Sequence, residues 1–358
     1  MTDGPAHGGE RARGVGRADG AMHSPDMRER VKAYPGTLTY LDLIRRNKRE
    51  SVLLMAGMVL LGTVIAGALG AAIAAYSGAD VEVLLPSIIV GCVVGLAAGG
   101  IGALWSWFGG ANAILRMSRA TEITPEMDRE LFNVVDEIRI AAGLPMPRVY
   151  LIGDSAMNAF ATGRDPEHGV IAITTGLRSR LSRDELQGVI AHEMAHIRHF
   201  DIRFAMLMAT MVGLIAFACD AFFRVMWYGG GMRGGRRSGG KDGGGAVMIV
   251  IFVLTIVLAI LAPIVARIIQ MTYSRRREYL ADAGAVELTR NPLGLASALQ
   301  KLADDTEPLV DTANRGTAHM YIVNPLKKMR RSHQQKKSLF LSHPPIKDRI
   351  ARLLALAR

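Results

Sequence analysis

The stretch SRDELQGVIAHEMAHIRHFD, residues 182–201, is the most informative part of this 358-residue chain. It opens with Ser182 and Glu185 in the S-x-x-E pattern of a capping box, which predicts that a helix begins there. On such a helix, His192 and His196 lie one turn apart on the same face, with Glu193 between them. Two imidazoles at this spacing can bind one zinc ion, and the glutamate can accept a proton from water. The stretch therefore predicts a polar helix with a zinc site and Glu193 as its catalytic base.

Long apolar runs surround this polar helix. Half of the chain is hydrophobic and its mean hydropathy is +0.21. A membrane-spanning helix needs about 20 apolar residues, and the third run is the weakest because Asp220 and Arg224 fall in its far half. The runs are residues 52–76, 83–107, 204–227 and 246–270. We therefore expect a mostly α-helical integral membrane protein with about four transmembrane helices and a zincin-like α+β domain that contains a small β-sheet.

The charged residues indicate how the chain is oriented in the membrane. Arginines and lysines precede the first run and follow the second and fourth, whereas the loop between the first two contains Asp80 and Glu82 but no basic residue. By the positive-inside rule, both termini and the polar helix face the cytoplasm. The basic residues of the Gly-rich loop 229–245 do not agree with this topology, because it places that loop on the outer side of the membrane. The net charge of +11 favours the anionic lipid surface as a partner and not nucleic acid.

The chain divides into regions of different composition. We expect no cleavable signal peptide, because the first 50 residues are polar and the apolar run that follows is too long for one. A helix should start at Thr124-Pro125 and end at Gly143, and a last amphipathic helix should start near Ile346, with Ile350, Leu353 and Leu354 facing inward. Short strands are expected at 147–154, 158–163 and 169–177. The expected regions are a disordered tail (1–33), two spans (34–110), a first catalytic part (111–203), a membrane hairpin (204–270) and a second catalytic part (271–358).

A catalytic zinc site needs a third protein ligand. His199 shares the helical face of His192 and His196, but ligands at i, i+4 and i+7 of a straight helix span about 10 Å, too far for one ion. Glu278 is the better candidate, since it follows the fourth apolar run by as many residues as His196 precedes the third. Asp282 lies one turn after Glu278 and can accept a hydrogen bond from a ligand histidine.

Several motifs resemble those of the HtpX family of membrane gluzincin peptidases, relatives of the CAAX prenyl proteases. The resemblance covers about residues 40–355. The motifs are NAFATG (158–163), SRDELQGVIAHEMAH (182–196), SRRREYLADAGAVELT (274–289), HMYIVNPL (319–326) and LSHPPIKDRI (341–350). It implies one zinc ion per chain, bound by His192, His196 and Glu278, with Glu193 as general base and Asp282 orienting a ligand histidine. It also implies an endopeptidase of the bacterial inner membrane that acts on membrane proteins from the cytoplasmic side, in stress response and protein quality control.

Other candidate residues follow from their positions near these motifs. Asn158 and Ala159 lie on a predicted edge strand, which can bind an extended peptide substrate by strand addition. His343 is a candidate catalytic residue that could approach the oxyanion or plug the site.

Two other functions remain open. The chain can be a membrane scaffold with a structural zinc, which would be closed by four protein ligands. It can also be an intramembrane zinc protease, although Asn291-Pro292-Leu293-Gly294 lacks the aspartate of the N-P-D-G motif of that class. The natural substrate and the oligomeric state do not follow from the sequence.

Overall fold

The computed structural model describes residues 40–77, 79–228, 244–305, 321–322 and 344–357. The described residues before position 47 and those from 47 onward belong to two separate units. Apart from the first turns of one helix, the membrane helices, the sheet and the candidate site all belong to the second unit. Several predicted features lie outside the described residues, namely the tail 1–33, most of the Gly-rich loop 229–245 and His343.

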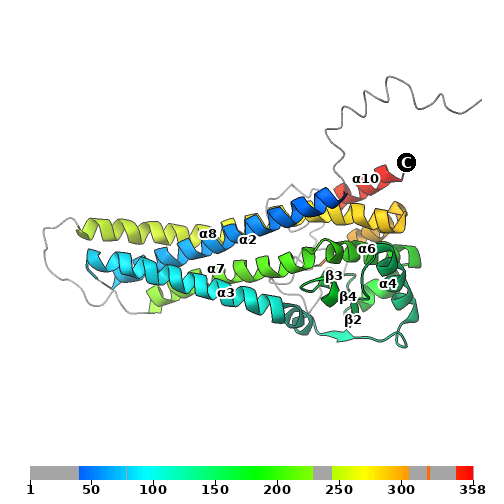
Figure 1. The fold of residues 1–358 in the computed structure, drawn as a ribbon, viewed down its shortest axis with the longest axis horizontal. Coiled ribbons are helices and arrows are strands. Elements are labelled where there is room, and N and C mark those ends of the chain that lie inside the picture. Colours follow the sequence, from blue (N-terminus) through cyan, green and yellow to red (C-terminus); the bar gives the residue numbers. More distant parts are fainter. Residues whose placement is uncertain (1–39, 78, 229–243, 306–320, 323–343, 358) are drawn as a thin grey trace, which may run out of the picture. The chain divides into compact units, whose positions relative to one another are not determined.

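Four long helices correspond to the four predicted apolar runs (Figure 1). They are α2 (Tyr40–Tyr76), α3 (Leu84–Met117), α7 (Asp201–Tyr228) and α8 (Gly244–Thr289). By length and composition, each contains or forms part of a stretch that can cross a membrane: Val52–Tyr76, Val81–Met117, Asp201–Tyr228 and Ile249–Met271. The third stretch is also a candidate span, although Asp220 and Arg224 lie within it. The prediction of a mostly helical membrane protein with four spans is confirmed.

Helix α8 joins the fourth span to the polar part of the chain without a break. Its apolar stretch ends at Met271, and the helix continues to Thr289, with Pro263 inside its membrane part. Because a helix rises about 1.5 Å per residue, Glu278 lies roughly 10 Å beyond the end of the apolar stretch. One rigid element therefore sets the distance between the membrane and the predicted third ligand.

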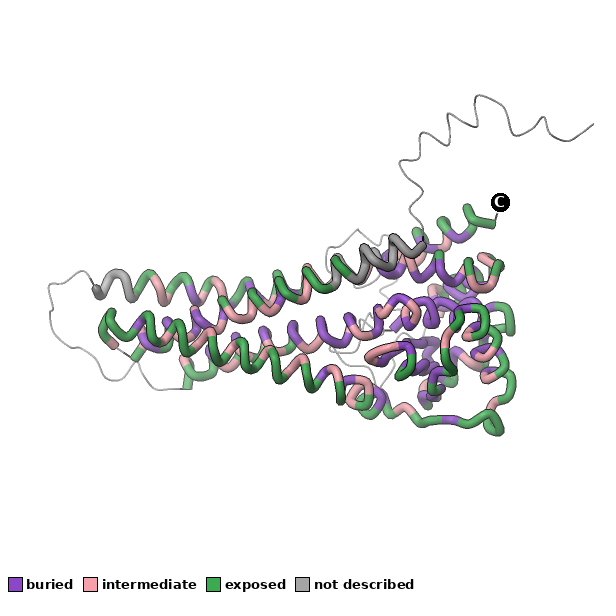
Figure 2. The backbone as a smooth tube through the Cα atoms, in the orientation of Figure 1, coloured by how far each residue is buried: buried purple, intermediate pink, exposed green. Residues whose placement is uncertain are grey.

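Helices α2 and α3 approach each other closely through glycine. A Cβ atom on Gly70 would lie 2.4 Å from the backbone oxygen of Ser87, and one on Gly91 would lie 2.4 Å from that of Ala66. No side chain fits at either distance, so both positions require glycine. Many of the other residues of α3 are apolar and exposed, and much of that helix has the green of exposed residues in Figure 2. Such a surface suits contact with lipid.

A four-stranded mixed sheet lies between α3 and α7 in the sequence, with the strand order β1-β2-β4-β3. Strands β2 (Arg148–Ile152) and β4 (Val170–Thr174) are parallel. Strand β1 (Ala120–Glu122) pairs antiparallel with β2, and β3 (Ala159–Thr162) pairs antiparallel with β4. The three predicted strands are thus present, with β3 at an edge as expected. The sequence did not predict β1, because three residues are too few to show a two-residue alternation.

Two predicted element ends differ from the structure because nearby side chains act as caps. The first polar helix, α4 (Arg129–Ala142), begins after the predicted Thr124-Pro125, since the side chain of Asp128 accepts a hydrogen bond from Leu131 N at 3.0 Å. It ends at Gly143 (φ 66°), as predicted. Residues 175–177, predicted as strand, begin the short helix α5 (Thr175–Arg180), which Thr174 caps.

The remaining helices are α6 (Arg183–Arg198), α9 (Pro292–Asp304) and α10 (Ile346–Leu356), with short 3-10 turns at Val81–Val83 and Pro166–His168. The inward face of α10 differs from the prediction. Leu353 is buried and Ile350 is half-buried against the core, but Leu354 is exposed. Arg349 is fully buried instead. A main apolar core joins α4, α6, α9 and the sheet, and α6 runs through it.

Candidate metal centre and active site

Helix α6, which carries the histidine pair, is buried over most of its length (purple in Figure 2). It starts at the predicted capping box, in which Ser182 N donates to the Glu185 carboxylate at 2.8 Å and Glu185 N donates back to the Ser182 hydroxyl. Helix α9 packs closely against it, since a Cβ on Gly188 would lie only 2.6 Å from Leu295 N. On this helix His192 is 0% exposed and Glu193 is 2% exposed. Polar groups buried to this extent need specific partners.

The structure brings His192, His196 and Glu278 together. One potential ligand atom from each lies within 4.8 Å of the other two. Glu278 Oε2 is 3.7 Å from His192 Nε2, and Glu278 Oε1 is 3.7 Å from His196 Nε2. Ligand atoms about 2.1 Å from a tetrahedral zinc ion are separated by about 3.4 Å. The donor set and its spacing therefore fit one zinc ion.

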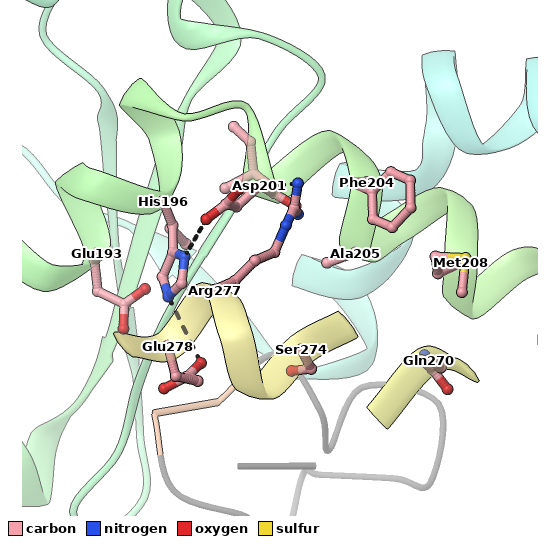
Figure 3. Close-up of a pocket in the computed structure, with 12 residues that line it drawn as sticks. Glu193, His196, Asp201, Phe204, Ala205, Met208, Gln270, Ser274, Arg277 and Glu278 are labelled. Carbon is pink, nitrogen blue, oxygen red and sulfur yellow. Dashed lines mark hydrogen bonds and ion pairs between the residues drawn. The ribbon is translucent and has the colours of Figure 1, made fainter. Parts of the chain in front are cut away.

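His196 is held on its other side by Asp201. The Nδ1 atom of His196 lies 3.0 Å from Asp201 Oδ2, which leaves Nε2 pointing toward Glu278 (Figure 3). Phe200, the residue before α7, has a φ of 62°, and this left-handed residue turns the chain so that Asp201 faces back to His196. Arg277 of α8 lies 2.9 Å from Asp201 Oδ1 and donates to the Asp201 carbonyl oxygen at 2.9 Å. The first residue of α7 therefore links the histidine to α8.

His192 has an equivalent partner in Asp282. The distance from His192 Nδ1 to Asp282 Oδ1 is 3.0 Å, as expected for an aspartate that orients a ligand histidine. Asp282 is in turn held by Arg349 of α10, whose Nη1 also lies 3.0 Å from Glu278 Oε2. Each histidine is therefore backed by an aspartate, and each aspartate by an arginine.

Sequence reasoning missed Arg349 and Arg277 at the site, and it left open whether Asp201 supports a ligand histidine or caps a helix. For Arg349 a signal was present: it occupies the inward stripe of an amphipathic helix, between Ile346 and Leu353, where a lone charge is unusual. Burial works against the charge of this guanidinium, but the carboxylates of Asp282 and Glu278 outweigh it and raise the pKa of Arg349. The arginine therefore stays charged at the buried end of the site.

Glu193 lines the same cavity as His196 and Glu278 (Figure 3). Its burial raises the pKa of the carboxyl to about 7, even though His196 and a hydrogen bond from the Ala161 backbone N–H favour the charged form. A carboxyl group that changes protonation state near neutral pH suits a general base that must later return its proton. The position and the pKa of Glu193 are thus both appropriate for proton transfer.

The two histidines differ in their electrostatic surroundings. Burial lowers the pKa of His192, which favours the neutral imidazole. Burial also opposes protonation of His196, but Asp201 and Glu278 outweigh it and raise its pKa to about 9. A metal ion bound at His196 would therefore displace a proton.

A sequence comparison relates the chain to a known family. The profile described as "Peptidase family M48" matches residues 125–357. The chain belongs to peptidase family M48. Among its curated relatives, the "Protease HtpX homolog" of Ligilactobacillus salivarius is 42% identical over 311 residues. The protein of the same name from Lactiplantibacillus plantarum is 43% identical over 314 residues. Each alignment covers 87% of this chain and 97% of the relative.

A solved structure also resembles this M48 chain: the crystal structure of S. mikatae Ste24p, with 20% identity and a TM-score of 0.41, covering 76% of this chain and 67% of that one. The family and the HtpX homologues, together with the four membrane helices, support a membrane metalloprotease. The predicted relationship to HtpX proteins is confirmed.

The edge strand of this M48 peptidase is partly occupied by its own chain. Thr174 N donates to Asn158 O at 3.0 Å, so in the antiparallel pairing the backbone groups of Ala159 and Ala161 point to the outer edge. There, Ala159 O accepts a hydrogen bond from Ile322 N at 2.9 Å. The Asn158 side chain accepts one from Ala159 N at 3.1 Å. The substrate-binding roles of Asn158 and Ala159 therefore remain predictions.

Among the residues that the structure describes, His199 is not part of the ligand group. His199 ends α6 and is buried, and burial lowers the pKa of its imidazole to about 4, so it is neutral. Within the part of the chain that the structure describes, the group that could hold a metal consists of His192, His196 and Glu278. This agrees with the sequence argument against His199. His343 lies outside the described residues, and its catalytic role remains a prediction.

Proposed function

We propose that this protein is a zinc-dependent endopeptidase of the bacterial inner membrane that cleaves misfolded or damaged membrane proteins at the cytoplasmic surface. The observation that carries the proposal is the convergence of His192, His196 and Glu278 within 4.8 Å, beside a cavity that Glu193 also lines. The membership of peptidase family M48 supports the same reaction.

In this proposal His192, His196 and Glu278 hold the zinc ion. When bound, zinc supplies a Lewis acid that polarises the scissile carbonyl and makes water acidic near neutral pH. Glu193 accepts the proton of the attacking water and passes it to the leaving amide nitrogen. Asp282 and Asp201 fix the orientation of the two histidines, each through a ring nitrogen 3.0 Å away.

The connection of the site to two membrane helices supports membrane proteins as substrates. Asp201, which contacts His196, is the first residue of the span in α7, and Glu278 lies on the extension of the span in α8. A peptide bond reaches this site only where its chain runs close to the membrane edge. The distribution of basic residues around the spans favours a cytoplasmic orientation of the site and of both termini.

The alternative functions find less support. A structural zinc is usually closed by four protein ligands, whereas the described ligand group has three members. The Asn291–Gly294 segment, similar to a motif of intramembrane proteases, has a structural role. Asn291 caps α9 by accepting a hydrogen bond from Gly294 N at 3.2 Å. Helix α6, with both histidines, also lies outside the four candidate spans.

Glu193→Gln tests the proposed mechanism. In the purified full-length protein this variant should keep one zinc per chain but lose peptide cleavage, because the amide cannot accept the proton. Glu278→Ala should lower the zinc content instead. Glu287→Gln, an exposed glutamate of α8, is the matched control and should change neither property. Full cleavage by Glu193→Gln, or unchanged zinc in Glu278→Ala, would contradict the assignment.

A further inference from the structure

The cavity at the candidate active site continues past the catalytic groups toward the membrane. It contains about 540 Å³ of empty space, including the part open to solvent. One end is lined by Glu193, His196 and Glu278. The other end lies between α7, which contributes Phe204, Ala205 and Met208, and α8 (Figure 3). The catalytic and the membrane-side ends thus form one continuous space.

The membrane-side end of this cavity lies within the candidate spans. Phe204, Ala205 and Met208 belong to the first two turns of the span in α7, and Gln270 belongs to the last turn of the span in α8. Ser274 lies one turn beyond Gln270 on the same helix. A side chain in this cavity would therefore lie at the level of the membrane edge.

The lining of the membrane-side end combines apolar residues, the neutral polar residues Gln270 and Ser274, and one arginine that is held in an ion pair. Its one arginine, Arg277, is engaged by Asp201 through a 2.9 Å ion pair and lies 4.7 Å from the centre of the Phe204 ring. An acidic substrate side chain would have to break this buried pair to gain a partner. A basic side chain would be repelled by the positive charge of Arg277 itself. An apolar side chain neither breaks the ion pair nor repels Arg277, and it buries its surface against Phe204 and Met208.

The edge strand β3 borders this cavity through Ala161, and its outer edge is already occupied at Ala159, whose carbonyl oxygen accepts from Ile322 N. The backbone of Ala161 points to the outer edge of β3, where its N–H donates to Glu193, and Ala161 also lines the cavity. Because the Ala161 N–H already donates to Glu193, a peptide at this edge would donate to the Ala161 carbonyl oxygen, which would place a peptide bond next to Glu193. Because successive side chains of an extended peptide alternate in direction, one side chain that flanks this bond points into the cavity.

We propose that this membrane-side end of the cavity is a specificity pocket for one large apolar side chain adjacent to the cleaved bond. The inference rests on the proposed peptidase function. It restricts the substrates to segments in which an apolar residue lies beside an accessible peptide bond at the membrane edge. Ala205 is the residue that sets the pocket size, since it is small and half-buried between two larger apolar residues on the same wall.

A peptide library of random sequence tests the pocket, with the zinc-loaded full-length protein in detergent and mass spectrometry of the products. For the wild type we expect Leu, Ile, Met or Phe at one position flanking the cleaved bond, roughly tenfold more often than Asp, Glu or Lys. Ala205→Leu should shift that position toward Ala and Gly by a similar factor, at unchanged zinc content. Ser274→Leu narrows the opposite wall and should act in the same direction.

Ala216→Leu is the matched control, because Ala216 is a half-buried alanine of α7 outside the cavity lining. It should keep the wild-type preference. If wild type and all three variants cleave with the same, residue-independent pattern, the pocket is overturned while the peptidase function stands. If the zinc-loaded wild type cleaves no peptide, the proposed function fails and the pocket with it.

Discussion

Arg349 donates two hydrogen bonds to Asp282, from Nε to Oδ2 at 2.9 Å and from Nη2 to Oδ1 at 2.6 Å. Both side chains are buried, and they come from α10 and α8, 67 positions apart in the sequence. The same guanidinium lies 3.0 Å from Glu278 and 3.4 Å from the Ile322 carbonyl oxygen. A single cation therefore holds the proposed third ligand, the aspartate behind His192 and the segment that covers β3.

Replacement of Arg349 should weaken both zinc binding and folding. In Arg349→Lys the ammonium cannot reproduce the two-pronged contact, so we expect a loss of zinc affinity of about 10- to 100-fold. Arg349→Leu leaves two carboxylates buried without their cation and should lower the free energy of unfolding by about 3–5 kcal/mol. Zinc titration and thermal unfolding in detergent measure the two effects. Arg352→Lys, an exposed arginine of the same helix, is the control. Wild-type zinc affinity in Arg349→Lys would refute the positioning role.

Asp201→Asn should reduce the affinity for zinc, although the asparagine side chain has the same shape as the aspartate. The amide loses the charge that Arg277 and His196 both contact, at 2.9 Å and 3.0 Å. We expect zinc affinity to fall about 10- to 100-fold, because such partners orient the ligand histidine. The control is Asp220→Asn, an exposed aspartate of α7 that pairs with Arg224. Equal zinc affinities for the two variants would show that Asp201 does not support His196.

Gly188→Ala should separate α6 from α9. The added methyl group would lie 2.6 Å from Leu295 N and 2.9 Å from Leu295 Cα, and backbone atoms cannot move aside cheaply. We expect destabilisation of about 1–3 kcal/mol in thermal unfolding, the usual cost of overpacking. At Gly153 a Cβ would meet nothing within 4 Å, so Gly153→Ala is the matched control and should be close to neutral. A neutral Gly188→Ala would mean that the two helices pack less tightly than the structure indicates.

The stability contribution of Glu185 should depend on pH. Burial raises the pKa of this carboxyl, but hydrogen bonds from Lys301, Ser297 and Ser182 outweigh it and lower the pKa from 4.5 to about 2. Because the pKa of Glu185 is lower in the folded protein than in the unfolded chain, the ionised carboxylate stabilises the fold above about pH 4.5. This stabilisation is lost as the pH falls from about 4.5 to 2. Glu185→Gln should therefore cost about 2 kcal/mol at pH 7 and progressively less below pH 4.5.

Unfolding of the wild type and of Glu185→Gln in detergent, compared from pH 7 down to pH 3, measures this difference. Lys301→Met removes the main cation at Glu185, whose Nζ lies 2.7 Å from Oε2, and should reproduce the same pH window. A constant difference between wild type and variant at every pH would rule out the ionised Glu185 as its source.

Much of the fold could be predicted because it depends on local patterns. Apolar runs long enough to cross a membrane identified the four spans, and the S-x-x-E pattern identified the start of α6. The prediction was less accurate where short-range caps compete. The start of α4 depends on Asp128, and the end of β4 depends on Thr174. A propensity pattern does not distinguish between neighbouring candidate caps.

The sequence by itself determined the metal-binding motif and the membrane hairpin behind it. The spacing of His192 and His196 on one helix predicts a pair of ligands, and the return of the chain after the fourth apolar run predicts Glu278 as the third. Only the tertiary structure revealed Arg349 behind Asp282, Arg277 behind Asp201, Ile322 on the edge of β3 and the cavity between α7 and α8. The physical reason is that a periodic pattern specifies which face of a helix is buried. The partner of a buried charge is decided by the packing of elements that are distant in the chain.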